Sequence, residues 1–235
     1  MKIGLGLGLT RFAGSGGASD PYASFTAAYD FGNASGYTLN GSNIATAVNL
    51  APGGSGYDLA QATDSLRPVL TSGQAVFDDS NDYLENTSSL PTLIQSNSFH
   101  ANFTFTIDSL ASDGTLFACS QATTNARFWM QFLTNGALRI SCRNLAGTTF
   151  TTKDVRADGT SLGFSTATEY SLGLEFTGGT LSVWVDGIKV YDAVAFDMSS
   201  QDATFTRADV GVLRISTSSF SPFGGKIKAF NFTSV

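Results

Sequence analysis

Several residue types that carry chemistry in proteins are scarce in this chain of 235 residues. It has two cysteines and one histidine, too few for a disulfide framework or for the four ligands of a structural zinc site. Lysine and arginine together number 13 against 19 acidic residues, and they form no basic cluster. Such clusters bind phosphate backbones and anionic lipids, so we expect no nucleic-acid partner and no binding to an anionic membrane surface.

Long apolar runs and helical patterns are also missing. No run approaches the roughly 20 apolar residues that span a bilayer, so we expect no membrane insertion. The only helical turn that we expect covers residues 199–203. Phenylalanine is abundant instead, with 19 copies, and 42% of all residues are hydrophobic. This composition predicts one all-β domain with a large core.

Apolar residues at every second position mark antiparallel hairpins. Residues 170–176 and 181–187 flank a Gly-Gly turn, and residues 127–133 and 137–143 flank Asn135-Gly136. Asn-Gly between two such segments is a strong hairpin signal. Further strands are expected at 99–107, 115–120, 188–191, 210–216 and 225–232.

The first segment alternates glycine with Ile3, Leu5, Leu7 and Leu9. One face of such a strand has no side chains, so another sheet can approach it closely. We interpret residues 1–19, which end in a Gly/Ser linker, as an arm that docks onto a neighbouring subunit, and residues 20–235 as the folded domain. This interpretation predicts a homo-oligomer or a repeated copy in a particle. The alternative is an edge strand that completes the chain's own sandwich.

Both cysteines lie in segments with strand character. Cys142 has the same parity as Leu138 and Ile140, so its side chain is expected to point inward. We expect Cys119 and Cys142 to be buried free thiols. A disulfide between neighbouring strands is the alternative.

Three motifs, in this order, resemble those of concanavalin A-like (laminin-G-type) jelly-roll domains of lectins and glucanases. The first begins at Gln61, passes through Arg67-Pro68 and ends in Val76-Phe77-Asp78 to Asp82-Tyr83-Leu84; the second is 181–187; the third is 222–230. In the first motif Asp79 stands where the family usually has glycine. The resemblance implies an antiparallel two-sheet jelly-roll β-sandwich whose closing strand lies beside its first strand.

The opening arm, together with residues 28–31 and Arg67-Pro68, also resembles structural proteins of tailed bacteriophages and prophages. Those proteins carry lectin-like domains on tails, fibres or capsids. The resemblance implies a virion protein, assembled in the bacterial cytoplasm, that binds other virion subunits through the arm and a host cell-surface glycan through the domain. The alternatives are a decoration or tail-assembly subunit without glycan binding, a secreted lectin, and a glycan hydrolase.

Catalytic patterns are not evident in the sequence. Glycosidases need two carboxylates that face one sugar bond, and laminarinase-type relatives carry them as Glu-x-Asp-x-x-Glu on one strand. Glu175 is alone on its strand, and Glu85 and Glu169 lie at strand ends. His100 has no recognisable nucleophile beside it. We therefore expect a protein that is not an enzyme and that needs no cofactor.

A candidate glycan-binding surface follows from side-chain parity. If Phe128 and Met130 point into the core, the residues between and beside them point outward. Flat rings pack on sugars, and arginine pairs with a carboxylated sugar. If the two main hairpins form one meander, its outer face carries Trp129, Gln131, Arg139, Arg143, Glu175 and Trp184. The alternative is that the two tryptophans are covered by a loop or by a neighbouring subunit.

The acidic loop 78–82 contains Asp78, Asp79 and Asp82. Aspartate and asparagine are ordinary turn residues, and we interpret this segment as a turn. Calcium, which takes several carboxylate oxygens, is the alternative ligand of this loop.

Overall fold

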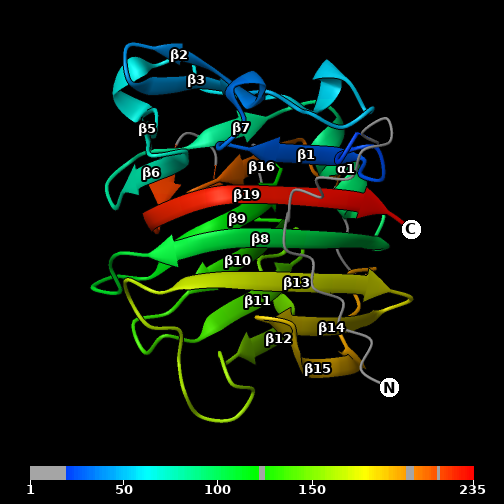
Figure 1. The fold of residues 1–235 in the computed structure, drawn as a ribbon. Helices are drawn as coiled ribbons and strands as arrows, with labels where there is room; N and C mark the ends of the chain where they lie inside the picture. Colours follow the sequence, from blue (N-terminus) through cyan, green and yellow to red (C-terminus); the bar gives the residue numbers. More distant parts are fainter. Residues whose placement is uncertain (1–19, 122–124, 200–203, 216–217) are drawn as a thin grey trace, which may run out of the picture.

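The computed structural model describes residues 20–121, 125–199, 204–215 and 218–235. The expected docking arm, with Ile3, Leu5, Leu7 and Leu9, lies outside the described residues, as does most of the helical turn expected at 199–203. The described strands form two stacked layers, which confirms the prediction of an all-β sandwich (Figure 1).

The front sheet is the layer nearer the viewer in Figure 1. Its order is β15-β14-β13-β8-β19, and the far edge of β19 pairs with both β1 and β6. The strands are β1 (Ala27–Asp30), β6 (Gln74–Asp78), β8 (Phe99–Ile107), β13 (Glu169–Thr177), β14 (Thr180–Val185), β15 (Ile188–Ala195) and β19 (Gly224–Ser234). The closing strand therefore lies beside the first one, as expected, with Phe232 opposite Ala27.

The back sheet has the order β7-β16-β9-β10-β11-β12. Its strands are β7 (Leu84–Asn86), β9 (Gly114–Ser120), β10 (Arg127–Phe132), β11 (Leu138–Arg143), β12 (Thr149–Val155) and β16 (Arg207–Val210). The two predicted hairpins are thus both present, β10–β11 here and β13–β14 in the front sheet.

Short elements connect the layers at one side of the sandwich, at the top of Figure 1. They are the strands β2 (Tyr37–Asn40), β3 (Asn43–Ala47), β4 (Leu59–Ala60) and β5 (Val69–Thr71), and the 3-10 helices η1 (Ala34–Gly36), η2 (Ser55–Tyr57) and η3 (Asp64–Leu66). The pairings β6–β5, β5–β3, β3–β4 and β4–β7 make the two layers one continuous sheet.

The space between the layers is filled mainly by phenylalanine. Burial along β8 alternates without interruption, so its odd-numbered residues from Phe99 to Ile107 point inward. Phe103 stacks on Phe230 of the neighbouring strand with 5.6 Å between ring centroids, and Phe105 lies 5.2 Å from Phe132 of the opposite layer. Such ring pairs add to the free energy of apolar burial. Cys119 and Cys142 are buried free thiols, as predicted.

Several elements, β12 among them, were not expected from the sequence. Two of these differ from the main sheets in type or in pairing. One is the helix α1 (Ser89–Gln95), whose apolar residues Leu90, Leu93 and Ile94 are buried. The helix is too short for a periodic pattern to stand out over several turns. The other is the hairpin of β17 (Leu213–Ile215) and β18 (Ser218–Phe220), a separate two-stranded sheet. None of the helices in the described residues is long and apolar enough to cross a membrane.

Candidate functional site

The six residues predicted to form one glycan-binding surface lie on two opposite faces of the sandwich. β10 and β11 belong to the back sheet, whereas β13 pairs with β8 and not with β12, so β13 and β14 belong to the front sheet. The chain crosses between the layers in the loop that joins β12 to β13 (Figure 1). The single four-strand meander is therefore wrong, and the residues form two separate groups.

Trp129, Gln131, Arg139 and Arg143 remain together on the outer face of the back sheet. Arg127, which the sequence analysis did not select, lies opposite Arg143 in the register of β10 and β11. Its parity is the same as that of Trp129, so the rule that selected the tryptophan also selects Arg127. The Cζ atoms of Arg127 and Arg143 lie 5.1 and 5.7 Å from the centroid of the Trp129 ring. We call these three residues the arginine–tryptophan surface.

Among the described residues, no carboxylate pairs with the arginines of this surface. Within the described residues Arg139 pairs with Asp154, and Arg207 and Arg214 pair with Asp209, but neither Arg127 nor Arg143 forms an ion pair. The Arg127 side chain is buried, and its Nε and Nη1 atoms have no hydrogen-bond partner. Burial, and after it the charge of Arg143, lower the pKa of Arg127 to about 10. A buried guanidinium without a partner is costly, so an anion at this point would stabilise it.

Arg143 is the accessible member of the pair. It is half-buried, and its Nε donates to Thr149 Oγ1 at 3.2 Å. The two Nη groups of its planar guanidinium are the donors that a ligand can use in a bidentate contact. Arg139 is less available, because its Nε and Nη2 both donate to the Asp154 carboxylate at 2.9 Å.

Trp129 is not an open stacking platform. Only 6% of its surface is exposed, because it packs with Ala118 of β9 and with Leu213 of the β17–β18 hairpin. The alternative in which both tryptophans are covered thus describes Trp129, whereas Trp184 is half-buried on the other face. Its role on the surface is to hold the two guanidinium groups against its ring.

A buried ion cluster anchors the covering hairpin. Arg214 of β17 donates from Nε to Asp209 Oδ1 at 3.0 Å, contacts Glu85, and lies 3.9 Å over the Tyr83 ring. Arg207 pairs with the same carboxylate, with 3.1 Å between Nε and Oδ2. Asp209 is fully buried, so removal of either arginine would leave its charge poorly compensated.

Glu175 and Trp184 lie on the outer face of the front sheet. Trp184 is half-buried beside Gly173, and the Lys189 ammonium lies 4.9 Å from its ring centroid. Glu175 lies opposite His100, with 3.9 Å between its Oε1 and the His100 Nε2. Both Glu175 and Trp184 are accessible, but the thickness of the sandwich separates them from the arginines.

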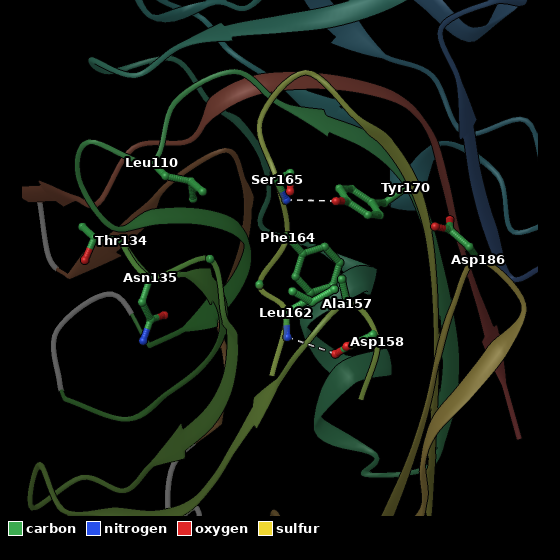
Figure 2. Close-up of a pocket in the computed structure, with 12 residues that line it drawn as sticks. Leu110, Thr134, Asn135, Ala157, Asp158, Leu162, Phe164, Ser165, Tyr170 and Asp186 are labelled. Atoms are coloured by element: carbon green, nitrogen blue, oxygen red, sulfur yellow. Dashed lines mark hydrogen bonds between the residues drawn. The ribbon is translucent and has the colours of Figure 1, made fainter. Parts of the chain in front are cut away.

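The described residues also enclose an open pocket of about 550 Å³ at the end of the sandwich where β8 ends and β13 begins (Figure 2). We call it the end pocket. Its walls are the turn 134–136, the loop 157–165, and the side chains of Leu110, Tyr170 and Asp186. The sequence analysis missed it, because loops that are far apart in the chain form it.

The acidic loop is a turn that its own carboxylates stabilise. The Asp78 carboxylate accepts from the amides of Ser80 and Asn81 at 3.0 and 3.3 Å, and Asp82 Oδ2 accepts from the Asp78 amide at 3.2 Å. Asp79 has φ of 60°, the left-handed conformation that explains why glycine is usual at this position. Within the described residues no three His, Cys, Asp or Glu side chains converge as metal ligands.

No protein-family model matches the sequence, and no curated protein is similar to it. Solved structures do share the fold. The Trypanosoma rangeli sialidase in complex with sialic acid aligns with a TM-score of 0.62 at 14% identity over 93% of this chain and 32% of that chain. The K499G mutant of NanB sialidase from Streptococcus pneumoniae aligns with a TM-score of 0.54 at 16% identity over 72% of this chain and 27% of that chain.

These comparisons correct two expectations. The predicted role as a non-enzymatic virion protein is wrong, because the two solved structures reported above are sialidases and neither is described as a phage or concanavalin A-like protein. The expectation that the protein is not an enzyme is contradicted by the same finding. The chain spans a third or less of the length of these sialidases. The similarity therefore shows the fold alone and does not assign an activity to this chain.

Proposed function

We propose that this β-sandwich is a glycan-binding domain whose ligand carries a carboxylate, with sialic acid as the leading example, and that it serves a protein that acts on such glycans. The observation that carries the proposal is the pair of guanidinium groups on Trp129, with which no carboxylate in the described part of the chain forms an ion pair. The finer assignment to the concanavalin A-like jelly rolls is part of the same proposal, supported by the two-layer topology.

The two arginines have different roles in this proposal. Arg143 contacts the ligand carboxylate through its Nη groups. Arg127 is buried beside it and adds positive charge in a medium of low dielectric constant, where a charge acts more strongly than in water. Gln131 lies opposite Arg139, on the far side of the Trp129–Ser141 pair from Arg127 and Arg143, and supplies an amide group for sugar hydroxyls.

The sialidase comparison supports the same class of ligand. The Trypanosoma rangeli enzyme is described in complex with sialic acid, a sugar with a carboxylate. In a sialidase-type enzyme, a binding domain of this kind raises the local concentration of substrate near the catalytic domain.

Replacement of Arg143 tests the proposal. Arg143→Gln removes one charge from the arginine–tryptophan surface, and we expect at least a tenfold loss of affinity for a methyl α-sialoside in a calorimetric or NMR titration, about 1.4 kcal/mol. The methyl ester of the same sugar, which has no negative charge, should bind the parent protein as weakly as the sialoside binds the variant.

Lys228→Gln is the matched control. It also removes one positive charge, but from an exposed side chain on β19 of the front sheet, and it should leave sialoside affinity unchanged. Equal affinity of the parent protein for the acid and its ester, or full affinity in Arg143→Gln, contradicts the proposal.

A further inference from the structure

The end pocket differs in chemistry from the arginine–tryptophan surface. Asp158 and Asp186 are the charged residues among those that line it, and both are acidic. A carboxylated sugar would be repelled here, since like charges at close range cost free energy. The ligand of this pocket must therefore be uncharged or cationic.

The pocket has apolar walls next to its polar rim. Leu162 is 65% exposed, an unusual position for a leucine, and Leu110 lies across the pocket from the Asp158 end of the loop (Figure 2). The rings of Phe164 and Tyr170 are buried behind them. Sugar rings present their C–H faces to apolar surfaces of this kind while their hydroxyls reach polar groups at the edge.

Donors and acceptors stand on opposite sides of the pocket. Figure 2 shows Asn135 on one side of Phe164 and Asp186 on the other. The Asn135 Oδ1 accepts from the Ala137 amide at 3.0 Å, and the NH2 group of this rim residue carries two donors. The Asp186 Oδ1 accepts from the Ser171 amide at 2.8 Å, and the carboxylate has further lone pairs for hydroxyl groups.

The pocket is formed before any ligand arrives. The Phe164 amide donates to the Gly136 carbonyl oxygen at 2.7 Å, which joins the turn to the loop. A Cβ atom on Gly163 would come within 2.7 Å of the Asn135 carbonyl oxygen, so only glycine permits this approach. The Asp158 carboxylate accepts from the Leu162 amide at 3.1 Å and closes the loop on itself (Figure 2). A preformed site binds without the cost of ordering its loops.

From these observations we infer that the end pocket binds an uncharged pyranose ring, independently of the carboxylated sugar assigned to the back sheet. The volume of about 550 Å³ lies within the usual range for small-molecule sites. The domain then has two sites of opposite chemical preference, which suits a branched or mixed glycan with both neutral and acidic sugars.

NMR titration with three neutral probes tests this inference: the methyl glycosides of β-galactose, β-glucose and N-acetyl-β-glucosamine. At least one should shift the amide signals of Gly136, Gly163 and Asp186 in a saturable manner at millimolar concentration. Leu162→Ala removes the exposed apolar wall and should weaken that binding at least fivefold, with no loss of thermal stability, because the side chain is largely in solvent.

Leu39→Ala is the matched control, since Leu39 is also exposed, at 44%, but lies on β2 at the far side of the sandwich. It should not change the affinity. The absence of saturable shifts at the pocket amides with all three probes overturns the inference, as does unaltered binding in Leu162→Ala. Sialoside affinity is measured separately. Leu162→Ala should leave the affinity for the sialoside unchanged, and Arg143→Gln should leave the affinity for the neutral glycoside unchanged. The two proposed sites can therefore be disproved independently of each other.

Discussion

At the scale of single residues, this domain carries charges where burial makes them costly. Arg127 has lost water without gaining an acid partner in the described residues, and its pKa is lowered to about 10 as a result. Positions that lower stability in this way are common at binding sites, because the ligand supplies the missing interaction. Asp82 is a second residue whose charge is buried, and burial raises the pKa of its carboxylate.

Asp82 is 6% exposed and lies near Asp78. Burial, followed by the negative charge of Asp78, raises its pKa to about 6. The folded protein therefore binds more protons than the unfolded chain between about pH 4 and pH 6, so the contribution of Asp82 to stability is lost as the pH rises through this window. Above pH 6 the buried charge destabilises the fold.

Asp82→Asn should remove this dependence. The variant keeps an oxygen that accepts from the Asp78 amide, and we expect it to be more stable than the parent protein at pH 7, on the order of 1 kcal/mol, and no more stable at pH 4. Denaturant unfolding at the two pH values gives the comparison. Asp108→Asn, which alters a half-exposed ion pair with Lys226, should change stability by less than about 1 kcal/mol at either pH. If the free energies of unfolding of Asp82→Asn and the parent protein differed by the same amount at pH 4 and pH 7, the raised pKa of Asp82 would be contradicted.

At the scale of elements, the β17–β18 hairpin decides what the back sheet presents. Leu213 covers Trp129, and Arg214 fixes the hairpin to Asp209 and Glu85. Without this cover, β10 would present an indole to solvent between two arginines. With the indole covered, the accessible polar group of the arginine–tryptophan surface is the guanidinium of Arg143.

Leu213→Ser should uncover Trp129. In a Trp184→Phe background, where Trp129 is the remaining tryptophan, we expect acrylamide to quench the fluorescence more strongly and the emission to move to longer wavelength. The loss of apolar burial should also cost about 1–3 kcal/mol of stability. Unchanged quenching would mean that the hairpin does not protect this ring.

At the scale of the whole molecule, one apolar core connects the two sheets. It includes Phe103 and Phe230 from the front sheet together with Phe117 and Phe128 from the back sheet. The chain also carries a net charge of −6, which repels anions at long range. At physiological salt this repulsion is screened beyond about 8 Å. The attraction of an acidic sugar must therefore come from short-range contacts with the arginine pair.

A shared core predicts that the two sheets unfold together. Trp129 reports on the back sheet and Trp184 on the front sheet, so the variants Trp184→Phe and Trp129→Phe isolate the two signals. In each variant the fluorescence transition should coincide in denaturant concentration with the loss of far-ultraviolet circular dichroism. A fluorescence midpoint that differs from the circular dichroism midpoint of the same variant would indicate that the sheets unfold as separate units.

Several features could be predicted because they depend on neighbours in the chain. Alternation identified the strands of the β10–β11 and β13–β14 hairpins, and the turns at Asn135-Gly136 and Gly178-Gly179 set their register. Parity also placed Trp129 and Arg143 on one outer face. The same rule places Arg127 on that face, since it lies two residues before Trp129 on the same strand.

The sequence by itself determined the class of fold, the hairpins and the inward or outward direction of each strand's side chains, because these follow from a two-residue period and from local turn geometry. The tertiary structure alone decided that β13 pairs with β8 and so lies in the other layer from β10 and β11. It also decided that a hairpin covers Trp129 and that distant loops enclose the end pocket. Such pairings between distant segments depend on how the whole core packs, and no local pattern in the chain encodes them.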